Sequence, residues 1–248
     1  MDFGGANSTV DFPRQSRLER ATKVRPFASE AALIDVFIKS YQKQNLTRDR
    51  FVLREFDCAN GIADMVLVEL GKTNSRSARL GNITPRWLYA LHALPYRKVF
   101  DLDSFVEMTG VTKRRAQIAM REYEAAGFCK PGKVANTWNK VWEPRPIATK
   151  IFAVEAKLRD WRRALAQATR YKDFAHASWV LLDEAFVFPA AQNLNEFRRC
   201  NVGVAACDLQ GNISVLFRPN IQTPRSVDKF WLATSLIAKH TISSNTRR

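Results

Sequence analysis

The chain has 248 residues, 46% of them hydrophobic, which is enough for a packed core in one or two domains. Its net charge of +15 favours nucleic acid over an anionic membrane as the partner, because a basic surface releases counterions from a polyphosphate. No apolar run approaches the roughly 20 residues of a membrane span, and the N-terminus has no secretory h-region, so we expect a cytoplasmic protein. The cysteines form no CxxC pair, so we expect neither a disulfide framework nor a zinc site.

The first part of the chain predicts a basic arm and then a helix. Residues 1–25 are polar and show little periodicity, which indicates an arm that is only partly ordered. From Ser29, a suitable N-cap, apolar residues recur at helical spacing as far as Tyr41, and Glu30 opens this helix. Because the helix macrodipole favours an acid in the first turn, a structural role for Glu30 is favoured over a catalytic one.

Segment 51–70 predicts two strands joined by a turn around Asn60 and Gly61, and Asp64 lies on the second strand. Asp disfavours strands and costs several kcal/mol when it is buried, charged and unpaired. The Asp64 carboxylate must therefore be solvated, paired or bound to a metal. From its position alone, a turn residue and a metal ligand are equally good interpretations.

Between Arg79 and about Arg145 the sequence changes character over a stretch far longer than a loop requires, which indicates an inserted domain. It predicts a helix ending at Gly110 and a second helix capped by Thr112, at the spacing of a helix-turn-helix, followed by a two-stranded wing. The alternative is a plain helical insertion with a solvated charged face. The candidate DNA-binding residues are Lys113, Arg114, Arg115, Gln117, Arg121, Lys133 and Lys140.

Segment 151–171 begins with an apolar, partly β-branched run that indicates a buried strand and leads directly into Glu155 and Lys157. Side chains two residues apart on a strand share a face, so the acid can hold a cation while the ammonium reaches the same phosphate or water. The helix that follows brings Gln167 and Tyr171 one turn apart, where both can lean toward the same strand end.

The last third of the chain predicts the rest of an α/β fold. A buried strand is expected over 179–182, then a helix, two strands over 202–207 and 213–217 separated by a turn, and an amphipathic helix over 226–239. Residues after this helix are polar and are expected to fray.

Three motifs follow one another along the chain: Gly61-Ile-Ala-Asp64, Glu155-Ala-Lys157, and Gln167-Ala-Thr-Arg-Tyr171. Together they resemble the PD-(D/E)xK nuclease superfamily, in its branch similar to the RecB nuclease domain. The resemblance covers about 29–70 and 149–188. It departs from the family pattern in the long insertion between the acidic residues and in the absence of a proline before Asp64.

The resemblance implies a restriction-endonuclease-like mixed sheet flanked by helices, with a small winged-helix domain inserted in it. The expected parts are a basic arm over 1–25, the nuclease core over 26–78 and 147–240, the inserted winged helix-turn-helix domain over 79–146, and a tail over 241–248.

The resemblance also implies a metal-dependent DNA endonuclease. Asp64, Glu155 and the Ala156 carbonyl would hold one or two Mg²⁺ ions together with the scissile phosphate, since oxygen ligands suit this hard cation, and Mn²⁺ would substitute for it. Lys157 would orient the attacking water or stabilise the transition state. Gln167 would fix Lys157 or the attacking water by hydrogen bonding, Tyr171 would support the site or contact the DNA backbone, and Glu30 would complete the metal shell. The substrate would be double-stranded DNA positioned by the winged helix, in restriction, transposition or defence against foreign DNA.

Two other functions are open. A non-catalytic DNA-binding protein of transcription-regulator type is disfavoured because Asp64, Glu155 and Lys157 are retained together. An RNA-processing nuclease is disfavoured because a major-groove helix fits B-DNA better than A-form RNA.

No Walker A motif is present, so no nucleotide cofactor is expected, and any ATP dependence would need a partner chain. A double-strand cut would need two active sites, which a homodimer would supply. A homodimer and a subunit of a larger complex are both open, and no membrane partner is expected.

Overall fold

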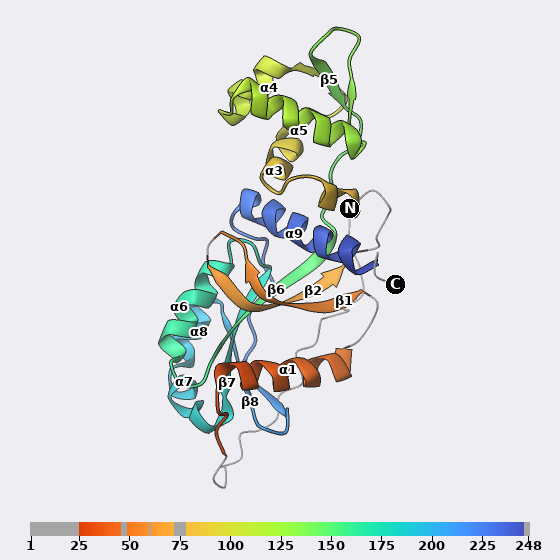
Figure 1. The fold of residues 1–248 in the computed structure, drawn as a ribbon. Helices are drawn as coiled ribbons and strands as arrows, with labels where there is room; N and C mark the ends of the chain where they lie inside the picture. The colour runs from red at the N-terminus through yellow and green to blue at the C-terminus, as the bar shows by residue number, and fades with distance from the viewer. Residues whose placement is uncertain (1–24, 46–48, 60, 72–77, 246–248) are drawn as a thin grey trace, which may run out of the picture. The chain divides into compact units, whose positions relative to one another are not determined.

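The computed structural model describes residues 25–45, 49–59, 61–71 and 78–245 (Figure 1). It divides into two compact units, the first formed by 1–69 and 150–223 and the second by 70–149 and 224–248. The basic arm expected over 1–25 lies outside the described residues except for its last position. Among the described residues, none of the helices combines the length and the hydrophobicity that a transmembrane segment requires.

The first unit contains a six-stranded mixed sheet in the order β1-β2-β6-β7-β8-β9. β1 and β2 form an antiparallel hairpin, β6, β7 and β8 run parallel, and β9 returns antiparallel to β8. The strands are β1 (Arg50–Asp57), β2 (Ile62–Leu70), β6 (Ala148–Lys157), β7 (Ala177–Asp183), β8 (Gly203–Cys207) and β9 (Ile213–Phe217). The apolar runs of β6 and β7 fit this arrangement because central parallel strands are buried on both faces. The predicted mixed α/β sheet is therefore confirmed.

Helices cover both faces of this sheet. They are α1 (Glu30–Asn45), α6 (Trp161–Tyr171), α7 (Phe188–Gln192) and α8 (Leu194–Cys200), with the short helix η2 (Glu184–Phe186). α1 buries Leu33 and Phe37 in one core cluster with Val154 and Ala156 of β6. Because strand side chains alternate, Glu155 points to the opposite face, where α6 packs along β7 and α8 along β8 and β9 (Figure 1).

The second unit combines helices with a small antiparallel sheet of order β3-β5-β4. Its elements are η1 (Arg79–Asn82), α3 (Arg86–Ala93), β3 (Val99–Asp101), α4 (Leu102–Thr109), α5 (Lys113–Ala125), β4 (Cys129–Pro131) and β5 (Thr137–Lys140). Gly110 ends α4 in the left-handed region, with φ of 66°, and Thr112 caps α5, both as the sequence predicts. Tyr123 of α5 is fully buried, and its hydroxyl donates to the Trp87 carbonyl oxygen at 2.6 Å.

The last helix, α9 (Val227–Asn245), groups with the second unit. The sequence places it in the second part of the core, 147–240, whereas in the structure it packs against η1 and α3. Trp231 is buried there, with its ring centroid 4.9 Å from that of His92. Helical periodicity identifies the apolar face of such a helix, but it does not identify the surface that covers this face.

Candidate active site

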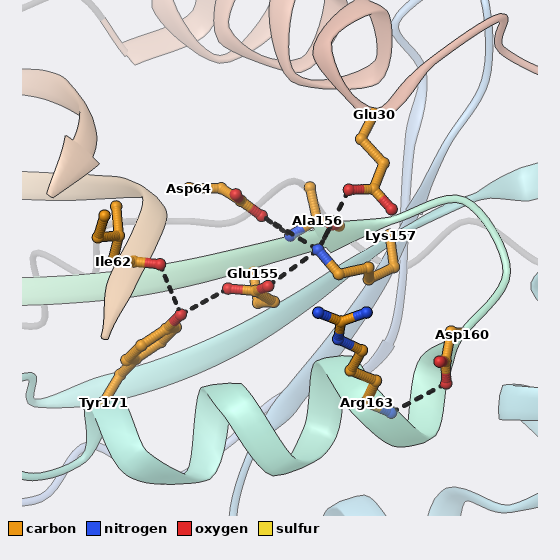
Figure 2. Close-up of polar contacts among 9 residues, drawn as sticks. All are labelled: Glu30, Ile62, Asp64, Glu155, Ala156, Lys157, Asp160, Arg163 and Tyr171. Atoms are coloured by element: carbon orange, nitrogen blue, oxygen red, sulfur yellow. Dashed lines mark hydrogen bonds and ion pairs between the residues drawn. The ribbon is translucent and has the colours of Figure 1, made fainter. Parts of the chain in front are cut away.

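The candidate site lies where β6 ends and brings together β2, β6 and the start of α1 (Figure 2). Asp64 and Glu155 point to the sheet face that α6 covers, because their strand neighbours Met65 and Ala156 belong to the core under α1. The backbone N–H of Ala156 donates to Asp64 Oδ2 at 2.7 Å. Asp64 is therefore a paired strand residue, and the turn interpretation does not apply to it.

The ammonium of Lys157 lies among oxygen atoms from four residues. Its Nζ donates to the Ala156 carbonyl oxygen at 2.9 Å and lies 3.0 Å from Glu155 Oε1, 3.2 Å from Glu30 Oε2 and 3.9 Å from Asp64 Oδ2. Burial alone would lower the pKa of Lys157, but the hydrogen bond and charge of Glu155, the charge of Asp64 and the hydrogen bond to Glu30 raise it overall. The Lys157 ammonium is therefore held in place as a donor to the surrounding oxygen atoms.

Glu155 is held in place by Tyr171 of α6. The carboxylate is 1% exposed, and the Tyr171 hydroxyl donates to its Oε2 at 2.6 Å while lying 2.9 Å from the Ile62 carbonyl oxygen. Burial and the neighbouring Glu155 carboxylate raise the pKa of Tyr171, so its hydroxyl stays protonated at neutral pH. The result is a fixed orientation for Glu155, with its second oxygen turned to Lys157.

Negative charge exceeds positive charge within this cluster. The carboxylates of Glu30, Asp64 and Glu155 surround the single ammonium of Lys157. Burial raises the pKa of Asp64, with the carboxylates of Glu155 and Glu30 adding to the effect, although the Ala156 N–H and Lys157 oppose it. A cluster with excess negative charge in a partly buried place is chemically suited to receive a cation.

The donor set fits Mg²⁺. Two carboxylates and a carbonyl oxygen, from Asp64, Glu155 and Ala156, converge on one cationic atom, and all are hard oxygen donors. The described residues contain no group of three or more His, Cys, Asp or Glu side chains arranged as a metal centre. Mg²⁺ does not need one, because it is usually bound by one or two carboxylates together with water and substrate phosphate.

The other two predicted supporting residues differ in their placement. Glu30 opens α1 as expected, and its ion pair with Lys157 joins it to the site. Gln167 lies one turn before Tyr171 on α6, but its Oε1 is buried without a hydrogen-bond partner among the described residues. The role of Gln167 toward Lys157 or a water molecule stays a prediction.

Comparisons with protein-family models, curated proteins and solved structures found no match. The resemblance to the PD-(D/E)xK superfamily therefore depends on the motif residues of this chain.

Arg163 points into the site although no motif includes it. Figure 2 shows its side chain directed from the first turn of α6 toward the end of β6 that carries Glu155 and Lys157. Arg163, Gln167 and Tyr171 follow one another at intervals of four residues, which places them on one side of the helix. This spacing is the sequence signal that could have identified Arg163.

The candidate DNA-binding residues of α5 lie on more than one side of the helix. Arg114, Gln117 and Arg121 are exposed and share one stripe by helical spacing, opposite the buried positions. Lys113 is also exposed and forms an ion pair of 2.7 Å with Asp103.

Arg115 and Lys133 lie elsewhere in the second unit. Arg115 lines a hollow of about 300 Å³ with residues of α3 and α4, including Tyr89 and Met108. Lys133 is exposed in the loop between β4 and β5.

Lys140 is a correction to the predicted DNA-binding set. It is 1% exposed, and its ammonium donates to the carbonyl oxygens of Leu91 at 3.3 Å and His92 at 3.2 Å. It also pairs with Glu143 at 3.0 Å. A buried ammonium with these partners cannot contact DNA, and its role is to join β5 to the end of α3. The sequence could not show this, because a short strand does not reveal which of its faces is covered.

Proposed function

We propose that this chain is a metal-dependent nuclease that hydrolyses the phosphodiester bonds of DNA. The observation that carries the proposal is the convergence of Asp64, Glu155 and Lys157 at one strand end, with Tyr171 fixing Glu155 from the helix behind it. These residues come from β2, β6 and α6, and their chemistry matches hydrolysis of a phosphate ester.

Each residue has a role that its contacts support. Asp64, Glu155 and the Ala156 carbonyl would hold Mg²⁺, which when bound lowers the pKa of water and neutralises charge on the phosphate. Lys157, charged at neutral pH, would donate to an oxygen of the reacting phosphate or orient the attacking water. The water oxygen bonds to phosphorus as the bond to the 3′ oxygen breaks, which leaves a 5′ phosphate and a 3′ hydroxyl.

We also infer that the second unit is a winged helix-turn-helix that binds duplex DNA. Support comes from the order of its elements, α3, β3, α4, α5, β4 and β5, and from the short turn at Gly110 between α4 and α5. The exposed stripe of Arg114, Gln117 and Arg121 has the composition of a helix that reads the major groove, and Lys133 lies in the loop that would be the wing.

The test is cleavage of supercoiled, linear and single-stranded DNA, and of RNA, in Mg²⁺, Mn²⁺ or EDTA. We expect metal-dependent nicking by the wild type and a loss of roughly 100-fold or more in Asp64→Asn and Glu155→Gln. The control is Glu55→Gln, which removes an exposed carboxylate from β1 and should cleave like the wild type.

Two results would contradict the proposal. Cleavage by Asp64→Asn at the wild-type rate would remove this site from the reaction. Binding of duplex DNA without cleavage in any metal would favour the non-catalytic DNA-binding protein, and preferential cleavage of RNA would favour the RNA-processing nuclease.

A further inference from the structure

We infer that Arg163 is a phosphate-binding residue that holds the DNA phosphate to be cleaved, opposite the carboxylates. The inference rests on the proposed nuclease function, and it adds a substrate contact that none of the three motifs contains. Its basis is the direction of the side chain, the lack of a partner for its guanidinium among the residues that the structure describes, and the charge of the site.

The direction of Arg163 follows from how α6 is held. Tyr171 at the end of this helix hydrogen-bonds Glu155, so the side of α6 that carries Tyr171 faces the end of β6. Arg163 lies eight residues earlier, and two steps of four residues turn the helix by only about 80° beyond two full turns. Figure 2 shows the resulting arrangement, with Tyr171 and Arg163 both directed from α6 toward Glu155 and Lys157.

The guanidinium of Arg163 has no structural task within the described residues. Only the backbone N–H of Arg163 is engaged, donating to Asp160 at 3.0 Å, while the exposed side chain makes no hydrogen bond or ion pair there. Two nearby arginines differ in this respect. Arg162 lies over the Trp161 ring at 4.5 Å, and Arg159 lies over the Phe186 ring at 3.9 Å. An arginine aimed at a reactive centre without a protein partner is available to a ligand.

The net negative charge of the site favours a further cationic side chain near it. Glu30, Asp64 and Glu155 carry three negative charges around the one positive charge of Lys157, an excess of two. A single bound divalent cation would balance that excess, and the bound phosphodiester anion would then leave the site with a net charge of minus one. Arg163 adds the missing positive charge, and its planar guanidinium can bind two phosphate oxygens at once.

The experiment compares Arg163→Gln with Arg162→Gln, which removes the same charge from the neighbouring position. Affinity for a labelled DNA duplex is measured by fluorescence anisotropy over a series of salt concentrations, with Ca²⁺ in place of Mg²⁺. Single-turnover cleavage is then measured in Mg²⁺. We expect Arg163→Gln to flatten the salt dependence by about one phosphate contact and to slow cleavage roughly 100-fold or more. Arg162→Gln should match the wild type in both measurements.

A second pair of variants separates phosphate binding from a structural role. Arg163→Lys keeps the charge but not the two-point contact, so its cleavage rate should lie between those of the wild type and Arg163→Gln. Free guanidinium ion should restore part of the cleavage lost in Arg163→Ala. A lowered melting temperature in Arg163→Ala without rescue would overturn the inference.

Failure of this inference can be told apart from failure of the nuclease proposal. If the wild type cuts DNA and Arg163→Gln cuts equally well, Arg163 does not hold the phosphate and the nuclease stands. If the wild type never cuts, the nuclease proposal fails, and the salt dependence of binding still decides whether Arg163 contacts a phosphate. An unchanged salt dependence of duplex binding in Arg163→Gln overturns the inference, whether or not the wild type cuts DNA.

Discussion

Tyr171 shows how one side chain links the sequence motif to the geometry of the site. The motif places it one turn after Gln167 on a helix, but its contact with Glu155 arises only when that helix packs on the sheet. Its hydroxyl is a donor to a buried carboxylate, and such charge-assisted hydrogen bonds are shorter and stronger than neutral ones. Tyr171 therefore contributes both to stability and to the orientation of the candidate metal ligand.

Replacement of Tyr171 by Phe should remove this hydrogen bond while preserving the ring. We expect the free energy of unfolding in urea to fall by about 2 kcal/mol, because Glu155 stays buried with one donor fewer. Nuclease activity should fall roughly 10- to 100-fold, since a residue that orients a metal ligand is lost. Tyr89→Phe, at an exposed tyrosine, is the control and should leave both quantities unchanged. Full activity in Tyr171→Phe would show that the orientation of Glu155 does not depend on the hydrogen bond from Tyr171.

At the scale of elements, α6 carries three of the side chains assigned to the site. Its start is fixed by Asp160, whose Oδ1 accepts the backbone N–H of Arg163 at 3.0 Å as an N-cap. Its far end is fixed by the bond from Tyr171 to Glu155. The position of Arg163 therefore depends on the cap at its own end of the helix.

Substitutions of Asp160 test this dependence. Asp160→Ala should lower the free energy of unfolding by about 1 kcal/mol, the usual cost of a lost cap, whereas Asp160→Asn retains an acceptor and should cost only a few tenths. Cleavage should decrease in the Ala variant more than in the Asn variant. Equal destabilisation of the two variants in urea would show that the charge of Asp160, acting on the helix dipole, matters more than the cap.

At the scale of the whole molecule, the net charge of +15 raises the question of whether the proposed DNA binding would depend on the total charge or on a local contact. Diffuse attraction depends on the total charge, whereas a docked helix depends on where the charges lie. The exposed stripe of α5 favours a local contact, because Arg114 and Arg121 lie on the same side of one helix.

Two double variants with the same net charge distinguish diffuse attraction by total charge from a local contact made by α5. Arg114→Gln with Arg121→Gln removes two charges from α5, and Lys39→Gln with Lys43→Gln removes two exposed charges from α1. We expect the first pair to reduce the salt slope of duplex binding by about two contacts and the affinity by roughly tenfold or more, with little change in the second. Equal effects would indicate that DNA binding follows total charge and would move the contact away from α5.

The features that depend on local periodicity could be predicted from the sequence. Alternation along β6 placed Glu155 and Lys157 on one side of a strand, helical spacing paired Gln167 with Tyr171, and the cap at Thr112 marked the start of α5. These features follow from the backbone geometry of a few consecutive residues, which the chain specifies wherever it folds.

Which surfaces contact one another became clear from the folded structure. It paired Glu30 with Lys157, buried Lys140 under α3, grouped α9 with the second unit and directed Arg163 to the end of β6. Each of these outcomes depends on contacts between segments far apart in the chain. A local pattern shows that a face is apolar or charged, but the partner of that face is chosen by the packing of the whole fold.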